Sequence, residues 1–407
     1  MSFVSFLRQN APWLAAGALL SFLSSFGQTF FIAIFAGEIR TTYGLSHGGW
    51  GSIYTLGTGA SAVAVLWAGG LTDRFRVRAL GSVVIAGLAV ACVAMALNGS
   101  VLVLPVLVFL LRFFGQGMAS HVAIVAMARW FTVNRGRALV VATFGFILGE
   151  ASLPITFVWL KRFFDWQQLW LVAAAISVAM IPVLFLLLRQ ERQPQHANGN
   201  DAVAGMLGQH WTRGQALRHP LFWALIPAIM AFPAFGTAFW FHQVHFAAVK
   251  GWDHLSFVTV IPLGTAVFAL STFTYGWAID RFGAARLMPF YLLPLVLAFG
   301  LHWYAPSLVW SAVAIMLMGV AGGGQATLPA ACWAEFYGTR HLGAIKSTVA
   351  AFMVLGSALG PGLSGWLIDL GLDLPAQYLG YGLVFLVISV GMVGPVSRAR
   401  SDLSSSH

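Results

Sequence analysis

Long apolar runs separated by short loops recur along the whole chain, and this pattern constrains the fold more than any other feature. The 407 residues are 59% hydrophobic and only 8% charged, whereas a soluble protein keeps about a quarter of its residues charged. The runs repeatedly reach the roughly 20 residues that a helix needs to cross a bilayer. Because helices satisfy their own backbone hydrogen bonds in lipid, we expect an all-α membrane protein.

Twelve transmembrane helices are predicted, in two pseudo-symmetric six-helix bundles. The spans lie at about 12–36, 49–69, 79–97, 101–128, 138–160, 167–188, 221–247, 257–278, 287–304, 308–333, 343–368 and 376–396. The one long polar segment separates the sixth span from the seventh. We therefore expect an N-terminal six-helix bundle over 1–189, a cytoplasmic linker over 190–219 and a C-terminal six-helix bundle over 220–407.

The placement of the basic residues predicts the orientation. Seventeen of the 22 Lys and Arg residues fall in loops on one side of the predicted spans. Because Lys and Arg are retained on the cytoplasmic side, both termini and the linker are expected there, in a bacterial-type inner (plasma) membrane. The net charge of +10 is thus spread over loops between spans, and this distribution argues against a nucleic-acid partner.

A charged island between two apolar runs is repeated 207 residues later in the chain. We call residues 69–78 the first charged island and residues 276–283 the second charged island. The same offset aligns further identical residues, namely Gly44 with Gly251, His47 with His254, Gly57 with Gly264, Gly115 with Gly322, Gly117 with Gly324, Gly136 with Gly343, Gly149 with Gly356, and Pro154 with Pro361. The chain therefore reads as two parallel six-helix halves. Such repeats place a substrate site near the midplane and work by rocking one half against the other.

The first charged island resembles the loop between helices 2 and 3 of the major facilitator superfamily. The matching residues are Gly69, Leu71, Asp73, Arg74 and Arg78, and Arg76 replaces the second glycine of the motif. The second charged island keeps Gly276, Asp280, Arg281 and Gly283 but lacks the trailing basic pair. Leu111-Arg112-x-x-Gly115-Gln116-Gly117 resembles the helix 4 motif of the same family. The resemblance covers nearly the whole chain and implies a secondary transporter.

Within the superfamily, two further features resemble the oxalate/formate and monocarboxylate branch. They are Trp130-Phe131 followed by Arg135-Gly136-Arg137-Ala138, and the glycine-rich helices 5 and 11. This resemblance implies a small carboxylate as substrate.

Asp73 with Arg74, and Asp280 with Arg281, are the candidate cytoplasmic gate. A carboxylate at the mouth of one half is favoured near the positive N-terminal end of a helix in the other half, by about 0.3–1 kcal/mol when exposed. We predict a latch that holds the cytoplasmic side shut and breaks on opening. The alternative is a topogenic charge cluster that only fixes the orientation.

Arg112 and Glu150 are the only charged residues well inside the predicted spans. An ionisable group at that depth is costly and usually faces a partner or a wet cavity. We predict that Arg112 binds an anionic group of the substrate, with Gln116 four residues on along the same helix face. Glu150 is then the protonatable coupling site. In the structural alternative, Arg112 and Glu150 form one buried ion pair that ties helix 4 to helix 5.

Three more polar residues are candidate substrate contacts. In the superfamily, helices 1, 4, 7 and 10 line the cavity, so the resemblance makes Gln28 and Gln325 substrate contacts. His242 shares a face of helix 7 with His245, and we interpret it as a cavity residue. The alternatives are helix–helix hydrogen bonds for the glutamines and an interfacial belt for the histidines. Because no nearby carboxylate or thiol completes a ligand set for the histidine pair, no metal site is predicted.

The sequence thus predicts a proton-coupled secondary active transporter that moves a small organic solute by alternating access. A monocarboxylate-like anion suits Arg112 as the lone cation of the cavity. The alternative is a proton-driven exporter of amphipathic, drug-like compounds. A membrane-embedded enzyme would need a catalytic cluster near one face, and the two histidines of helix 7 are the nearest approach to one. No phosphate-cradling loop is present. We expect no cofactor, and a monomer whose partners are the substrate, protons and the lipid bilayer.

Overall fold

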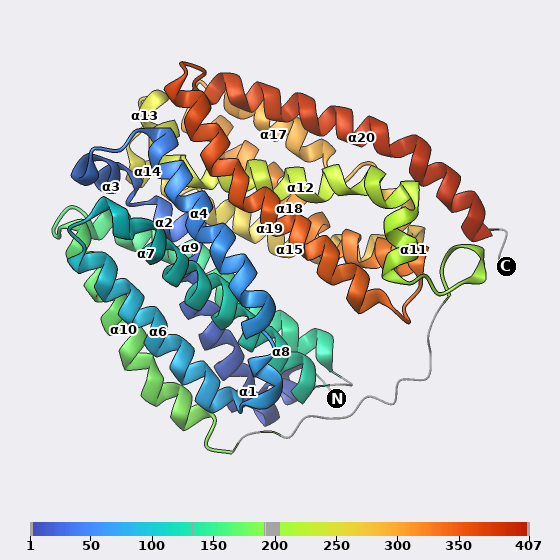
Figure 1. The fold of residues 1–407 in the computed structure, drawn as a ribbon, viewed down its shortest axis with the longest axis horizontal. Helices are drawn as coiled ribbons and strands as arrows, with labels where there is room; N and C mark the ends of the chain where they lie inside the picture. Colours follow the sequence, from blue (N-terminus) through green and yellow to red (C-terminus); the bar gives the residue numbers. More distant parts are fainter. Residues whose placement is uncertain (1–2, 132–133, 191, 193–203, 405–407) are drawn as a thin grey trace. The chain divides into compact units, whose positions relative to one another are not determined.

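The computed structural model describes residues 3–131, 134–190, 192 and 204–404, apart from the side chains of Phe3, Asp73 and Ser404. Every regular element in these ranges is a helix (Figure 1). The chain divides into two compact units. The first comprises Met1–Asn198 with Trp240–Val244, and the second comprises Gly199–Phe239 with His245–His407. Most of the first half of the predicted linker, residues 191 and 193–203, lies outside the described residues.

The first unit contains six spans, two of which are interrupted. The first span consists of α1 (Phe3–Leu23), a 3₁₀-helix (Ser24–Gly27) and α2 (Thr29–Ala33). The fourth consists of α7 (Leu104–Leu111), a π-helix (Arg112–Ala119) and α8 (Ser120–Trp130). The others are α4 (His47–Ala68), α6 (Val77–Leu97), α9 (Arg135–Leu160) and α10 (Trp166–Leu187), with the short α3 (Ala36–Tyr43) and α5 (Leu71–Arg74) in loops.

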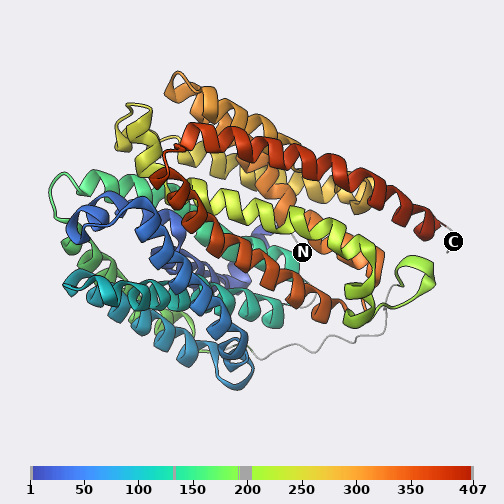
Figure 2. The ribbon, with the colours of Figure 1, turned by 45° about the horizontal axis from the view of Figure 1, so that its top comes forward.

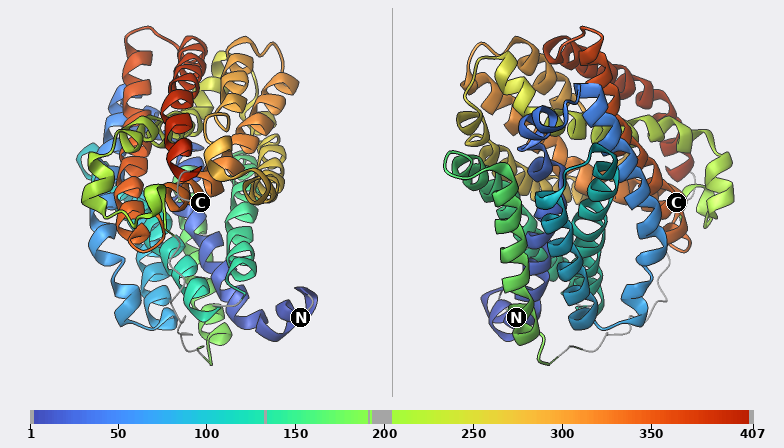
Figure 3. Two further views of the ribbon diagram at one scale, coloured as in Figure 1. Left: turned by 90° about the vertical axis from the view of Figure 1, so that its right-hand side faces the viewer. Right: turned by 60° about the vertical axis from the view of Figure 1, so that its left-hand side comes forward.

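The second unit can be followed from lime to red in Figures 2 and 3. Its long helices are α12 (Pro220–Phe241), α15 (Ile261–Phe282), α17 (Leu293–Tyr304), α18 (Leu308–Tyr337), α19 (Leu342–Asp369) and α20 (Leu374–Ser404). Its short helices are α11 (Arg213–Arg218), α13 (Gln243–Val249), α14 (His254–Val258) and α16 (Ala284–Leu287). Pro220 starts α12, where the N–H that proline lacks would have no helical partner.

Ten helices within the described residues are long and apolar enough to cross a membrane, and α4 and α17 complete the set of twelve. The predicted fold class is confirmed. Several predicted spans are wrong in detail, because 12–36, 101–128 and 221–247 are not continuous α-helices and the regular helix in 287–304 begins only at Leu293. The first breaks at Gln28, the fourth changes to a π-helix at Arg112, and α12 ends at Phe241, just before His242.

The repeated glycines mark equivalent helix crossings in the two units. A Cβ built on Gly57 of α4 would lie 2.8 Å from the carbonyl oxygen of Pro105, and one built on Gly264 of α15 would lie 2.9 Å from that of Ile315. A Cβ built on Gly149 of α9 would meet the side chain of Ser25, and one built on its counterpart Gly356 of α19 would meet the backbone carbonyl of Met230. The glycines recur because each crossing brings two helix backbones too close for a side chain.

The described end of the predicted linker packs on the C-terminal end of α18. The backbone N–H of Trp211 donates to the carbonyl oxygen of Tyr337 over 3.1 Å, and the Trp211 ring lies edge-on to the rings of Tyr337 and His219. Burial lowers the pKa of the His219 imidazole. Residues 204–219 are therefore a folded part of the second unit.

Gly57→Ala is expected to destabilise the protein, because the new methyl group must push α4 away from α7. Overpacking of this kind costs about 1–3 kcal/mol. Gly59→Ala on the same helix is the matched control, since a Cβ there meets nothing within 4 Å. The check is the thermal unfolding midpoint in detergent, and equal midpoints for the two variants would contradict the close crossing.

Candidate functional site

The break in the first span is held by a side chain of the fourth span. Gln28 has an extended backbone, with φ −84° and ψ 155°, so the carbonyl of Gly27 loses its place in a continuous helix. The Arg112 guanidinium replaces the missing backbone donor, with Nη1 donating to the Gly27 oxygen over 3.2 Å. A broken helix is tolerated at membrane depth where a neighbouring helix satisfies the freed backbone group in this way.

Two more residues complete the surroundings of this guanidinium, which we call the Arg112 site (Gly27, Thr29, Tyr54 and Arg112). Nη1 of Arg112 also donates to Thr29 Oγ1 over 3.2 Å, and this hydroxyl shares a 2.5 Å hydrogen bond with the Tyr54 hydroxyl. The guanidinium carbon lies 5.4 Å from the centre of the Tyr54 ring, within the range of a cation–π interaction. The first, second and fourth spans of the first unit thus meet at the Arg112 guanidinium.

Arg112 is 2% exposed, and its Nε has no hydrogen-bond partner. Its hydrogen bonds go to a carbonyl and a hydroxyl, and within the described residues it has no ion pair. The predicted alternative of an Arg112–Glu150 ion pair is therefore not formed. A buried charge without a counter-ion is unfavourable, which makes the Arg112 site a place where an anion would be stabilised.

The backbone around Arg112 is unusual over eight residues. Arg112–Ala119 is a π-helix. Such segments are rare in proteins, and those that occur are often found at functional sites. A Cβ on Gly115 would overlap the backbone of Gly27, so the two helices touch at their glycines beside Arg112. Gln116 lies half-buried in the π-helix, and Gln28 lies half-buried at the break of the first span. No hydrogen bond joins either glutamine to Arg112 in the described residues.

Glu150 lies in the middle of α9 and is half-buried. It directly follows Gly149, which packs on Ser25 immediately before the break in the first span. The structure therefore places Glu150 on the helix that supports the broken span from the side.

The second unit has an uncharged counterpart of the Arg112 site. The position equivalent to Arg112 in the repeat is Gly319, which packs on the backbone of Gly264. Further along α18, Gln325 accepts a 2.9 Å hydrogen bond from the Tyr291 hydroxyl, and its buried Nε2 has no partner. This amide is an unused hydrogen-bond donor in the second unit.

His242 is 4% exposed and lies at the break between α12 and α13. The segment Trp240–Val244, which contains His242, belongs to the first unit. The centre of the His242 ring lies 6.0 Å from the centre of the His47 ring. His245 instead pairs with Asp373 of the second unit, over 2.9 Å. The two histidines therefore have separate surroundings, and no cluster of three metal-ligating side chains occurs among the described residues.

A charged side chain hydrogen-bonds to the backbone in or directly after each charged island. In the first island, Arg129, near the end of α8, donates to the carbonyl of Thr72 over 2.7 Å. In the second unit, Glu335 of α18 accepts from the backbone N–H groups of Ala284 and Ala285, the two residues that follow the second island, over 2.8 and 3.2 Å. Arg74, Asp280 and Arg281 are exposed, whereas the side chain of Asp73 lies outside the described part of the structure.

Comparison with known protein families identifies the family of this chain. A family model described as Major Facilitator Superfamily matches residues 17–310 and 261–405. The chain belongs to the Major Facilitator Superfamily. It is accordingly an integral membrane transporter of small molecules and not an enzyme.

A curated relative matches a short part of this superfamily member. The Multidrug resistance protein B homolog of Mycobacterium tuberculosis is 34% identical over 114 residues, which are 28% of this chain. The match spans 19% of the relative's length.

Solved structures of other transporters share the fold over almost the whole chain. A bacterial homolog to the human lysosomal transporter Spinster is 18% identical with a TM-score of 0.65, and covers 97% of each chain. A mutant of the nucleoside transporter NupG is 13% identical, with a TM-score of 0.69. The match covers 96% of this chain and 99% of the NupG chain.

Several residues of the site were not predicted from the sequence. Thr29 and Tyr54 lie in apolar runs and carry no charge, and Glu335 follows a predicted span. The helix break at Gln28 was the missing information, because it exposes the carbonyl around which Arg112, Thr29 and Tyr54 assemble.

Proposed function

We propose that this transporter moves a small organic anion, best represented by a monocarboxylate, and that Arg112 is its anion site. The observation that carries the proposal is the buried Arg112 guanidinium, which has no ion pair among the described residues. A carboxylate is the group that a guanidinium binds best, through two parallel charge-assisted hydrogen bonds. The orphaned Nε offers one donor for such a contact.

In addition to Arg112, the proposal assigns substrate contacts to four polar residues. We assign this role to Gln28 and Gln116 in the first unit and to His242 at the helix 7 break. Gln325, whose Nε2 is buried without a partner, is the contact from the second unit. Alternating access requires the two halves to engage one substrate from opposite sides.

We further propose that transport is coupled to protons through Glu150. Glu150 is a half-buried carboxylate in the middle of a span, and a carboxylate is a group that can bind and release a proton. Glu150 also lies on the helix that packs against the broken first span through Gly149. A change of charge there acts on the same broken helix that the Arg112 site holds.

The charged islands are proposed as the cytoplasmic latch, formed by Asp73 with Arg74 and Asp280 with Arg281. The duplication supports this assignment, because a cluster that served orientation alone would not need an acid in both copies. We also propose a monomer of two six-helix bundles, 1–189 and 220–407, joined by a cytoplasmic linker at 190–219. Both termini would then be cytoplasmic, in a bacterial inner membrane.

Arg112→Gln is expected to lower the uptake of a labelled short-chain monocarboxylate into proteoliposomes at least about 30-fold. Removing one partner of a buried charge contact costs about 2 kcal/mol or more. Glutamine is shorter than arginine and neutral, and size-exclusion chromatography checks that the variant remains folded. The matched control is Arg162→Gln, which removes an exposed arginine.

A second candidate function rests on the curated relative, whose name describes multidrug resistance. If no acid of the panel is taken up by the wild-type protein, the anion proposal is wrong. Efflux of amphipathic cations against a proton gradient, retained in Arg112→Gln, would then favour the exporter.

Glu150→Gln is expected to abolish accumulation driven by an inward proton gradient, since the neutral amide cannot release a proton. Exchange of labelled for unlabelled substrate across the membrane should continue, because it needs no net proton movement. Glu150→Asp keeps the titratable group and should keep coupling. Gradient-driven accumulation by Glu150→Gln at the wild-type rate would assign the coupling to another residue.

The double variant Asp73→Asn, Asp280→Asn separates the latch from the topogenic alternative. Asp contributes little to membrane orientation, so a purely topogenic cluster predicts unchanged transport and conformation. The latch predicts a shift toward cytoplasmic opening. The distance between spin labels on the two halves, measured by double electron–electron resonance, would report this opening. The native Cys92 and Cys332 are buried and will not take up label. An unchanged distance distribution would contradict the latch.

A further inference from the structure

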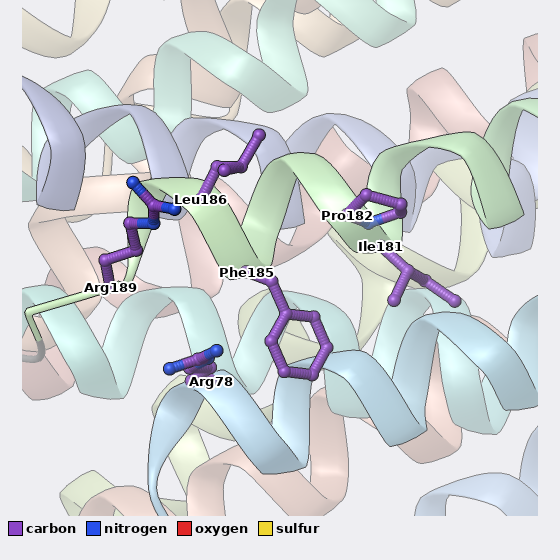
Figure 4. A pocket seen from close by; sticks show the side chains of 6 residues that line it. All are labelled: Arg78, Ile181, Pro182, Phe185, Leu186 and Arg189. Carbon is purple, nitrogen blue, oxygen red and sulfur yellow. The ribbon is translucent and has the colours of Figure 1, made fainter.

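A groove lies on the first unit between α6 and α10, outside the Arg112 site. Its volume is about 510 Å³, and its lining residues are Arg78, Ile181, Pro182, Phe185, Leu186 and Arg189. Figure 4 shows Phe185 pointing from α10 toward Arg78 on α6, with Arg189 just beyond the C-terminal end of α10. The groove therefore combines an apolar wall with two cations.

The two arginines are available to an anion. The Arg78 guanidinium carbon lies 4.6 Å from the centre of the Phe185 ring, which fixes the side chain, and its Nε is buried without a hydrogen-bond partner. Arg189 is exposed at the end of the span. Within the described residues neither arginine has a carboxylate partner. Two guanidinium groups in one groove match the oxygens of a phosphate.

The backbone at this end of α6 adds to the positive potential. Arg78 is the second residue of α6, and Arg76 at the N-cap makes no capping hydrogen bond with its side chain. The first turn of a helix carries a partial positive charge that favours anions. The N-terminal end of α6 thus adds to the positive potential of the two arginine side chains.

The apolar wall identifies the kind of molecule that carries the anion. Phe185 is 38% exposed and Leu186 is 59% exposed, and both lie on α10, a helix long and apolar enough to cross the bilayer. A water-soluble anion would leave these side chains uncovered, whereas an acyl chain would cover them. Basic pockets between transmembrane helices near the membrane surface suit the headgroups of anionic lipids.

We propose that this groove binds an anionic glycerophospholipid, with its phosphate on Arg78 and Arg189 and an acyl chain along Phe185 and Leu186. The lipid bridges α6 and α10 within the first unit. Because a ligand that binds only the folded state stabilises that state, the bound lipid raises the stability of the first unit. The proposal stands independently of the substrate and of the Arg112 site.

The test is lipid binding to the purified full-length protein in neutral detergent, followed by native mass spectrometry. Phosphatidylglycerol is titrated against the wild type and against the double variant Arg78→Gln, Arg189→Gln. Each lost arginine–phosphate contact should weaken the affinity about tenfold. The matched control, Arg162→Gln with Arg213→Gln, removes the same charge from two exposed positions and should bind as the wild type does.

Two further arms use the wild-type protein and do not depend on the folding of any variant. Phosphatidylcholine, which carries a compensating ammonium group, should bind at least about tenfold more weakly than phosphatidylglycerol. Inorganic phosphate should not displace the lipid. Equal binding of the two lipids, full binding by the Arg78–Arg189 double variant, or displacement by equimolar phosphate would each overturn the proposal.

Discussion

The hydrogen bond from Arg112 to the carbonyl of Gly27 supports the architecture of the first unit at its centre. A chain in lipid cannot leave a backbone carbonyl without a donor, so a broken helix needs a partner at the break. Arg112 is that partner, and it brings a full charge to a position that is 2% exposed. The same side chain is thus both the support of the broken helix and the natural site for an anion.

Four other charged side chains also hydrogen-bond to backbone groups at or near helix ends. Three of them donate to a backbone carbonyl. Lys161 donates to Ile34, directly after α2, and Arg129 donates to Thr72 of the four-residue α5. Lys250 donates to Trp303 in the last turn of α17. Glu335 does the reverse and accepts from the first N–H groups of α16. Helix ends carry unsatisfied groups and partial charges, so a few side chains placed there stabilise many elements. Lys161 also pairs with Glu38, one of the few ion pairs in the described residues.

The duplication explains which features the two units share and which they do not. Gly57 and Gly264, like Gly149 and Gly356, occupy equivalent crossings, because close packing of helix backbones is needed in both copies. Arg112 has no counterpart, since Gly319 stands at the equivalent position. At Ala234, the equivalent of Gly27, α12 runs without a break, and that span is interrupted only later, at His242. The repeat therefore preserves the scaffold, while Arg112 and the break at Gln28 have no counterpart at the equivalent positions.

The sequence by itself determined the class of protein, the twelve spans and the family, because apolar length and repeated glycines are local properties of the chain. It also singled out Arg112 and Glu150, since charges inside apolar runs are visible without a structure. It could not determine what Arg112 contacts, because its partners Gly27, Thr29 and Tyr54 are 85, 83 and 58 residues away in the sequence and become neighbours only through helix packing. The break at Gln28 and the π-helix at Arg112 were likewise decided by tertiary structure, because each distortion is stable only where the other helix satisfies its backbone.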